Sequence, residues 1–328
     1  MGRSYLMRHH AVIEVTSEVS IAPVSAIVTI CANQKRFKSG PNSTPAALAA
    51  APQATLARTW LDLIGATAPV AAATDLYGGR AFGLARDLAT SSRTKLFVVS
   101  AGFGLVPGDQ ELPAYSLTMA HHDQDSIQGK AVGPFDPATW FEALTDGPYS
   151  VAWSDVFSEG GGRVLVALTK PYAEMATPAL AKLPASDLSR LRLFGAGLSA
   201  VLPMALKPYL LPYDDRLDTL FPGTRSDFAQ RALVHFVQNV ALADGDYATD
   251  AARVRASLAA TKAPPRPARR AVTDEALLTL IRSRLSPRAS ASRLLRQLRD
   301  EDQIACEQGR FARLFRQAQT EGAAHDAP

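Results

Sequence analysis

Three apolar runs of the sequence each end in a loop that carries polar residues or glycines, and these loops hold the side chains best suited to chemistry. The runs have the composition of strands buried on both faces. The loops span residues 31–38, 100–115 and 195–199. Because ligands bind outside the carboxyl ends of the strands in doubly wound sheets, we expect the three loops to share one rim. Its polar side chains would be Asn33, Gln34, Lys35, Ser100, Asp109, Glu111, Tyr115 and Ser199.

The loop after the second run combines glycines with aromatic residues, beginning with SAGFG at 100–104. Glycine lets the backbone approach a ligand, and Phe103 and Tyr115 could stack on a planar base. The alternative is an ordinary tight turn after a strand. Neither this stretch nor the glycine pair at 195–197 completes a dinucleotide fingerprint. For HHD at 121–123, a solvated loop is favoured over a metal site.

Strands alternate with helical segments along most of the chain, and these elements must position the loops. Buried strands are predicted at 22–34, 95–100, 161–169 and 192–198. Such alternation is typical of an α/β fold with a doubly wound, mostly parallel sheet. We predict that this fold occupies residues 1–260.

A segment rich in proline and arginine, TKAPPRPARRAVT at 261–273, predicts a linker, because neighbouring prolines forbid a regular helix. Residues 274–320 predict a small helical unit, which would fit a winged-helix or helix-turn-helix fold. From 262 to 316, 13 Lys and Arg oppose six Asp and Glu, although the net charge of the chain is only +4. A polyanion, most often nucleic acid, is therefore the expected partner of this basic segment.

Arginines of the basic segment recur on one side of a predicted helix, opposite Leu294, Leu295 and Leu298. A solvated charged helix is the alternative to contact with phosphate. The charge of the whole region favours phosphate contact. The residues expected to contact nucleic acid are Lys35, Arg36, Lys38, Arg266, Arg269, Arg270, Arg293, Arg296 and Arg299.

The composition of the chain limits the classes of protein to which it can belong. The 328 residues are 47% hydrophobic and 20% charged, which is a globular composition. No apolar stretch approaches the roughly 20 residues that span a bilayer, and the start has no signal-peptide pattern. Cys31 and Cys306 have no partners at metal-binding spacing. We expect a reduced, cytoplasmic protein without a metal or a cofactor.

Three ordered motifs resemble a bacterial domain family: VTICANQKRF, DLYGGRAFGLARDLA and FVVSAGFGLVPGDQELPAYSLTM. The signature of that family runs C-x-x-x-K, D-L-Y-x-G and S-A-K-Y-G-L. The last pattern is shared with YaaA-like peroxide-stress proteins and with an accessory domain of archaeal tRNA-guanine modification enzymes. This chain has Gly102-Phe103 where the family has Lys-Tyr. The positions that match are Cys31, Lys35, Asp75, Leu76, Tyr77, Gly79, Ser100, Gly104, Leu105, Pro107, Tyr115 and Thr118.

The resemblance implies a uracil-DNA glycosylase-like fold and a DNA glycosylase, which flips a modified base and hydrolyses its N-glycosidic bond. That reaction needs a group to place water near the anomeric carbon and charge to stabilise an oxocarbenium-like transition state. The expected catalytic residues are Asn33, Gln34, Asp109, Glu111 and Asp75. The residues expected to hold the base are Ser100, Phe103, Tyr115 and Ser199.

Residues 291–315 resemble a tail of plasmid and mobile-element proteins. This second resemblance suggests a hypermodified phage base as substrate and a role in phage defence. Two alternatives remain open. One is a non-catalytic DNA-binding protein that recognises modified or damaged DNA. The other is a hydrolase or transferase of small nucleotides.

Overall fold

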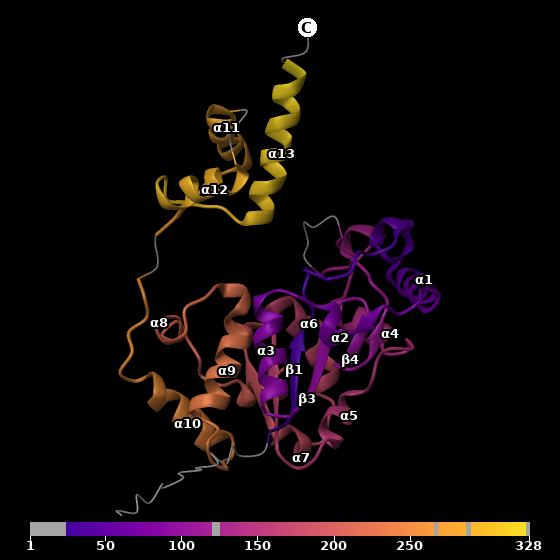
Figure 1. Cartoon of the computed structure of the whole chain (residues 1–328), viewed down its shortest axis with the longest axis vertical. Coiled ribbons are helices and arrows are strands. Elements are labelled where there is room, and N and C mark those ends of the chain that lie inside the picture. The colour runs from indigo at the N-terminus through magenta and orange to yellow at the C-terminus, as the bar shows by residue number, and fades with distance from the viewer. Residues whose placement is uncertain (1–23, 120–124, 266–267, 287–289, 326–328) are drawn as a thin grey trace, which may run out of the picture.

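The computed structural model describes residues 24–119, 125–265, 268–286 and 290–325. A five-stranded sheet forms the centre of the first two ranges, with the strand order β4-β3-β1-β6-β7 (Figure 1). Four strands are parallel, and β4 runs antiparallel to β3. The prediction of a mostly parallel α/β sheet is confirmed. The strands are β1 (Val24–Ile30), β3 (Lys95–Ser100), β4 (Gly104–Pro107), β6 (Arg163–Ala167) and β7 (Leu191–Phe194).

The apolar runs are buried strands, as their composition predicted. Ala26, Ile27 and Val28 of β1 have no exposed surface, because β1 pairs with β3 on one side and β6 on the other. The strand β4 was not predicted. It begins at Gly104, whose φ of 79° reverses the chain directly after β3. The first residues of the predicted loop at 100–115 therefore form the turn of an antiparallel strand pair.

Helices cover both faces of the sheet. In one layer α3 and α9 contact each other and the central strands, and Figure 1 shows these two helices side by side. In the other layer α4 packs against both α1 and α6. The helices of the two layers are α1 (Gln53–Gly65), α3 (Arg80–Ser91), α4 (Pro137–Leu144), α5 (Trp153–Ser158), α6 (Lys170–Leu180) and α9 (Phe228–Asn239). Shorter or peripheral elements are β2 (Ala71–Ala72), α2 (Ala73–Leu76), β5 (Glu111–Leu112), α7 (Ala185–Leu188), α8 (Leu217–Leu220) and α10 (Tyr247–Leu258).

The C-terminal residues have a hydrophobic cluster of their own. Leu294, Leu295 and Leu298 are buried in it, as the pattern of α12 predicted, together with residues of α11 and α13. The short strands β8 and β9 pair in parallel beside these helices. The elements are β8 (Arg270–Ala271), α11 (Asp274–Arg284), α12 (Ala291–Asp300), β9 (Ile304–Ala305) and α13 (Gln308–His325). The domain limits at 260 and 274 stay a prediction. Within the described ranges, no helix has both the length and the apolar character needed to cross a membrane.

Candidate functional site

The topology of the sheet creates a crevice at the carboxyl ends of β1 and β6. The chain leaves β1 toward β3 on one side and leaves β6 toward β7 on the other side. Connections that diverge from neighbouring strands leave a gap, and ligands of doubly wound proteins bind there. The site is thus located by the strand order, which the sequence pattern alone does not give.

A cavity of about 540 Å³ lies in this crevice, within the size range of small-molecule sites. Its wall contains the end of β1, the start of α3, the start of α6 and the residues before α9. We call it the switch-point cavity. Its lining consists of residues 30–34, 78–82, 118–119, 169, 171–172, 224 and 226–227.

Two of the sequence motifs are joined at this cavity by backbone hydrogen bonds. The amide of Gly78 donates to the carbonyl of Gln34, and the amide of Arg36 donates to the carbonyl of Leu76, both at 2.9 Å. Gly79 directly precedes α3 and has a φ of 82°, a conformation that favours glycine. The loop after β1 and the start of α3 therefore form one wall of the cavity.

A network of neutral hydroxyl groups lies at the ends of these motifs. The hydroxyls of Tyr77 and Tyr115 are 3.0 Å apart, and each lies within hydrogen-bond distance of Ser100 Oγ, at 3.3 and 2.8 Å. Ser100 Oγ also accepts from the amides of Gly102 and Phe103, both at 3.2 Å. All three hydroxyl groups belong to fully buried side chains. The network fixes the turn after β3 relative to the segment before α3.

Two tryptophans hold the same turn from the other side. The indole of Trp60 donates to the carbonyl of Gly102 at 2.7 Å, and that of Trp140 donates to the carbonyl of Ala101 at 2.8 Å. A Cβ atom at Gly102 would lie 2.6 Å from the Tyr115 ring, so a larger residue would displace that ring. The Gly102-Phe103 pair of this chain therefore fits a closed, buried turn.

Burial keeps the phenols near the cavity neutral. Loss of solvation raises the pKa of Tyr77, Tyr115 and Tyr172 well above the usual value. The hydroxyl of Tyr172 lies 3.0 Å from Cys31 Sγ, and both residues line the switch-point cavity. The Tyr172 hydroxyl is therefore a polar but uncharged group of the cavity wall at neutral pH.

The charge at the cavity comes from Arg80 and Asp227. Arg80 opens α3, and its side chain is 51% exposed. Its guanidinium lies 3.3 Å from the Asp227 carboxylate and donates to the carbonyl of Pro222 at 2.7 Å. Asp227 also accepts from Arg231 and from the amide of Thr224, both at 2.8 Å. Arg80 is thus an oriented cation that remains accessible to an anion.

The expected catalytic residues divide between separate places. Asn33 and Gln34 line the switch-point cavity. Asp109 does not, because β4 runs antiparallel and returns the chain to the start of β3. Glu111 and Asp75 are exposed in β5 and α2 and are not part of the lining. The expectation of one shared rim is wrong for Asp109 and Glu111, because it assumed that every loop follows a parallel strand.

The residues expected to hold a base are placed differently as well. Phe103 is 1% exposed and packs against the rings of Tyr115 and Tyr149, at centroid distances of 4.5 and 5.3 Å. Ser100 and Tyr115 belong to the buried hydroxyl network. All three side chains are buried, so none of them offers an exposed face on which a base could stack. Ser199 is exposed after β7 and lies outside the lining of the cavity.

The basic residues near the first loop have two environments. Lys35 Nζ lies 4.2 Å above the Tyr115 ring and donates to the carbonyl of Ala32 at 3.2 Å, which ties the loop to the hydroxyl network. Arg36 and Lys38 are exposed. Lys35 therefore supports the loop, and its neighbours face solvent.

In the C-terminal unit several arginines hold the fold together. Arg269 pairs with Asp300 at 3.0 Å, and Arg299 donates to the carbonyl of Cys306 at 2.7 Å. Arg270 in β8 and Arg293 and Arg296 on the outer side of α12 are exposed. Arg266 and the HHD stretch at 121–123 lie outside the described residues.

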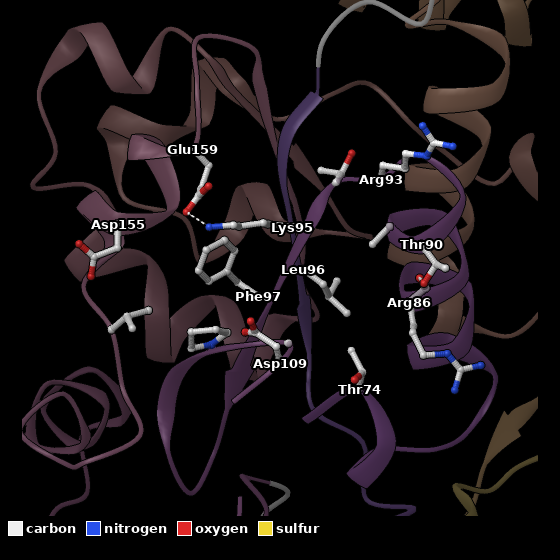
Figure 2. A pocket seen from close by; sticks show the side chains of 15 residues that line it. Thr74, Arg86, Thr90, Arg93, Lys95, Leu96, Phe97, Asp109, Asp155 and Glu159 are labelled. Atoms are coloured by element: carbon white, nitrogen blue, oxygen red, sulfur yellow. Dashed lines mark hydrogen bonds and ion pairs between the residues drawn. The ribbon is translucent and has the colours of Figure 1, made fainter. Parts of the chain in front are cut away.

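A second cavity, of about 600 Å³, lies at the amino end of β3, and we call it the amino-end cavity. Figure 2 shows its floor at Leu96 and Phe97, with Asp109 beside them. Its lining and that of the switch-point cavity share no residue. The described residues contain no cluster of three or more His, Cys, Asp or Glu that could hold a metal ion.

Sequence reasoning missed Arg80, Tyr172 and Asp227 as residues of the switch-point cavity. Arg80 follows the D-L-Y-x-G motif directly, so its position at the start of a helix was available as a signal. From the sequence alone, Asp227 could be interpreted only as an acidic residue at the start of a helix. Tyr172 lies in a helix far along the chain, and no local pattern connects it with Cys31.

Comparison with known proteins gives one match. Residues 67–132 match a family described as "Family of unknown function (DUF6884)". This segment contains Tyr77, Ser100 and Tyr115, together with all of α3. No curated protein and no solved structure matches the chain. The likeness to YaaA-like proteins and to uracil-DNA glycosylase-like folds stays a prediction. The matched segment contains the hydroxyl network and the start of α3, whereas the loop after β1, which completes that wall of the switch-point cavity, lies outside it.

Proposed function

We propose that the switch-point cavity receives one nucleotide of a DNA strand, and that the protein is a glycosylase-like enzyme that hydrolyses the N-glycosidic bond of a modified base. One observation carries the proposal. A cavity of about 540 Å³ at the carboxyl ends of β1 and β6 combines an oriented arginine with two amide side chains.

The lining offers separate surfaces to the base and to the phosphate. Ile30, Phe82 and Met119 provide apolar surface against which a planar base can pack. The Tyr172 hydroxyl has hydrogen-bonding capacity beyond its contact with Cys31, which suits the edge of a base. Arg80 would contact phosphate, and its place at the start of α3 favours an anion further.

The chemistry needs a positioned water molecule and compensation of positive charge. The water oxygen attacks C1′ while the bond from C1′ to the base nitrogen breaks. The base leaves with the bonding electrons and takes up a proton, and water loses one. The amides of Asn33 and Gln34 are suited to orienting that water. Asp227 is the one carboxylate among the lining residues that the structure describes, and it would stabilise the oxocarbenium-like sugar.

The C-terminal unit would add affinity that does not depend on base sequence. Arg293 and Arg296 project from α12 on the side opposite its buried leucines. Contacts of such arginines with phosphate release counterions, so affinity falls steeply as salt increases. A cavity for one nucleotide and a basic surface for the strand together favour a nucleic acid over a free nucleotide.

The test incubates the purified protein with DNAs that carry different modified bases, glycosylated phage pyrimidines among them. Free bases are detected by mass spectrometry, and abasic sites are detected by cleavage in alkali. We expect release from one modified DNA. Tight, salt-sensitive binding without release of a base from any DNA would favour the non-catalytic DNA-binding alternative. A DNA affinity that is insensitive to salt would favour a small nucleotide as the substrate.

Variants distinguish the catalytic residues proposed from the structure from those predicted from the sequence alone. Asn33→Ala with Gln34→Ala, and separately Asp227→Asn, should abolish release. Glu111→Gln should retain it, because Glu111 is exposed outside the cavity. Thermal unfolding of each variant shows whether a loss of activity is a loss of fold, which matters most for the buried Asp227. Full activity of the Asn33/Gln34 double variant would disprove the proposed site.

A further inference from the structure

The amino-end cavity carries two kinds of charge on separate sides of an apolar floor. Arg86 lies in α3 and Arg93 just after it, whereas Asp155 lies in α5 and Glu159 just after that helix. In Figure 2 the carboxylates lie to the left of Leu96, and the arginines lie to its right. Charges separated in this way suit a ligand that itself has two charged ends.

Most of these charges already have partners. Lys95 Nζ lies 2.6 Å from Glu159, and Arg86 pairs with its neighbour Asp87 at 2.8 Å. The Asp155 carboxylate accepts from the amide of Ala152 at 2.9 Å, which caps α5. In the part of the chain that the structure describes, the side chains of Arg93 and Asp109 make no hydrogen bond and no ion pair.

The backbone of Arg93 is itself unusual. Its φ is 53°, which places it in the left-handed region just after α3. The amide of Thr94 donates to the carbonyl of Ala89 at 2.9 Å, which is the pattern of a helix end that usually has glycine at this position. A cation at a helix C-terminus is favourable. An arginine one turn earlier would gain the same interaction without the strained backbone, so the fold does not explain arginine here.

We infer that the amino-end cavity binds a small dipolar ligand of the short-peptide class. The ligand's carboxylate would lie on the Arg93 guanidinium, which presents parallel donors to a carboxylate. Its ammonium group would lie on Asp109. Apolar side chains of the ligand would cover Leu96, Phe97 and Val151, which together with Pro107 provide apolar surface in the cavity. This binding site is separate from the proposed glycosylase site and does not depend on it.

The experiment titrates the full chain with the dipeptide leucylleucine and follows binding by saturation-transfer NMR and calorimetry. The N-acetyl derivative and the C-terminal amide of the same dipeptide each lack one charge. We expect both derivatives to bind at least about tenfold more weakly than the free dipeptide. Equal binding of the three compounds, or binding of none of them in the millimolar range, would overturn the inference.

Arg93→Gly is the most informative variant, because glycine fits the left-handed position and should leave the melting temperature equal or higher. It should nevertheless lose the dipeptide. Asp109→Asn should weaken binding of the free dipeptide to the level of its N-acetyl derivative. Arg58→Gln, at an exposed position of α1, is the matched control and should bind normally. Unchanged binding in Arg93→Gly would count against the site.

Discussion

The two ends of the central sheet bury polar groups in opposite ways. Toward the carboxyl ends of β1 and β3, the hydroxyls of Tyr77, Ser100 and Tyr115 form a neutral network. At the amino ends of β6 and β7, Arg163 and Arg192 both donate to the Asp250 carboxylate at 2.7 Å. Both clusters are shielded from solvent, but only the second contains charges.

The presence or absence of charge distinguishes a cluster that stabilises the fold from a cluster that supports a site. The Asp250 carboxylate belongs to α10, so its two ion pairs join this helix to β6 and β7. The arginines also donate to the carbonyls of residues 243 and 245, which leaves few donors for a ligand. The neutral network instead leaves the charge of the nearby cavity to Arg80 and Asp227, of which Arg80 is half exposed. Variants at the two ends test this distinction.

The largest effect is expected at the ion cluster. Asp250→Asn removes the charge that compensates Arg163 and Arg192, and such a loss in a buried cluster costs about 3–5 kcal/mol. Urea unfolding at neutral pH measures the change in the free energy of unfolding. Glu142→Gln, which breaks the exposed pair with Lys182, is the control and should cost less than about 1 kcal/mol. Equal effects of the two variants would contradict a structural role for the cluster.

The buried phenols of the neutral network and of Tyr172 should limit stability at high pH. Burial raises the pKa of Tyr77, Tyr115 and Tyr172 above the usual 10.0, so the unfolded chain releases these protons at a lower pH than the folded chain. Their contribution is fully present below pH 10 and is lost as the pH rises above it. Each phenol should lower the free energy of unfolding by about 1.4 kcal/mol per pH unit there. Urea unfolding between pH 9 and 11 measures the slope, and a flat profile would contradict it.

A single hydroxyl should have a moderate effect. Tyr115→Phe removes hydrogen bonds to Ser100 and Tyr77 within a buried network, and this should cost about 1–3 kcal/mol. Tyr149→Phe is a matched control at a partly exposed ring, with an expected change within about 0.5 kcal/mol. Thermal and urea unfolding of both variants measure the difference. A Tyr115 variant as stable as the control would show that the network contributes little.

The smallest effect on stability is expected at Arg80. Arg80→Gln breaks the contact of a half-exposed arginine with the buried Asp227, which still pairs with Arg231, so the loss should be less than about 1 kcal/mol. If Arg80 contacts phosphate, DNA affinity should fall and the slope of log affinity against log salt should decrease by about 1. Fluorescence anisotropy at several salt concentrations measures both quantities. Unchanged affinity and slope would remove Arg80 from the proposed interface, whereas Arg58→Gln should change neither.

The sequence by itself determined the four parallel strands of the sheet and much of the first wall of the site. Apolar runs of β-branched residues form strands wherever both faces are buried, and the leucine pattern of α12 predicted its buried side. Asn33 and Gln34 were found because they directly follow β1, and the loop after a parallel strand lies at a predictable end of the sheet.

Only the tertiary structure decided which loops meet. The single antiparallel strand β4 carries Asp109 to the opposite end of the sheet, and the strand order brings α6 and the start of α9 next to the end of β1. Local patterns report which face of an element is buried, but they contain no information about its neighbours. Tyr172 and Asp227 therefore join Cys31 at one cavity through contacts that depend on the packing of the whole chain.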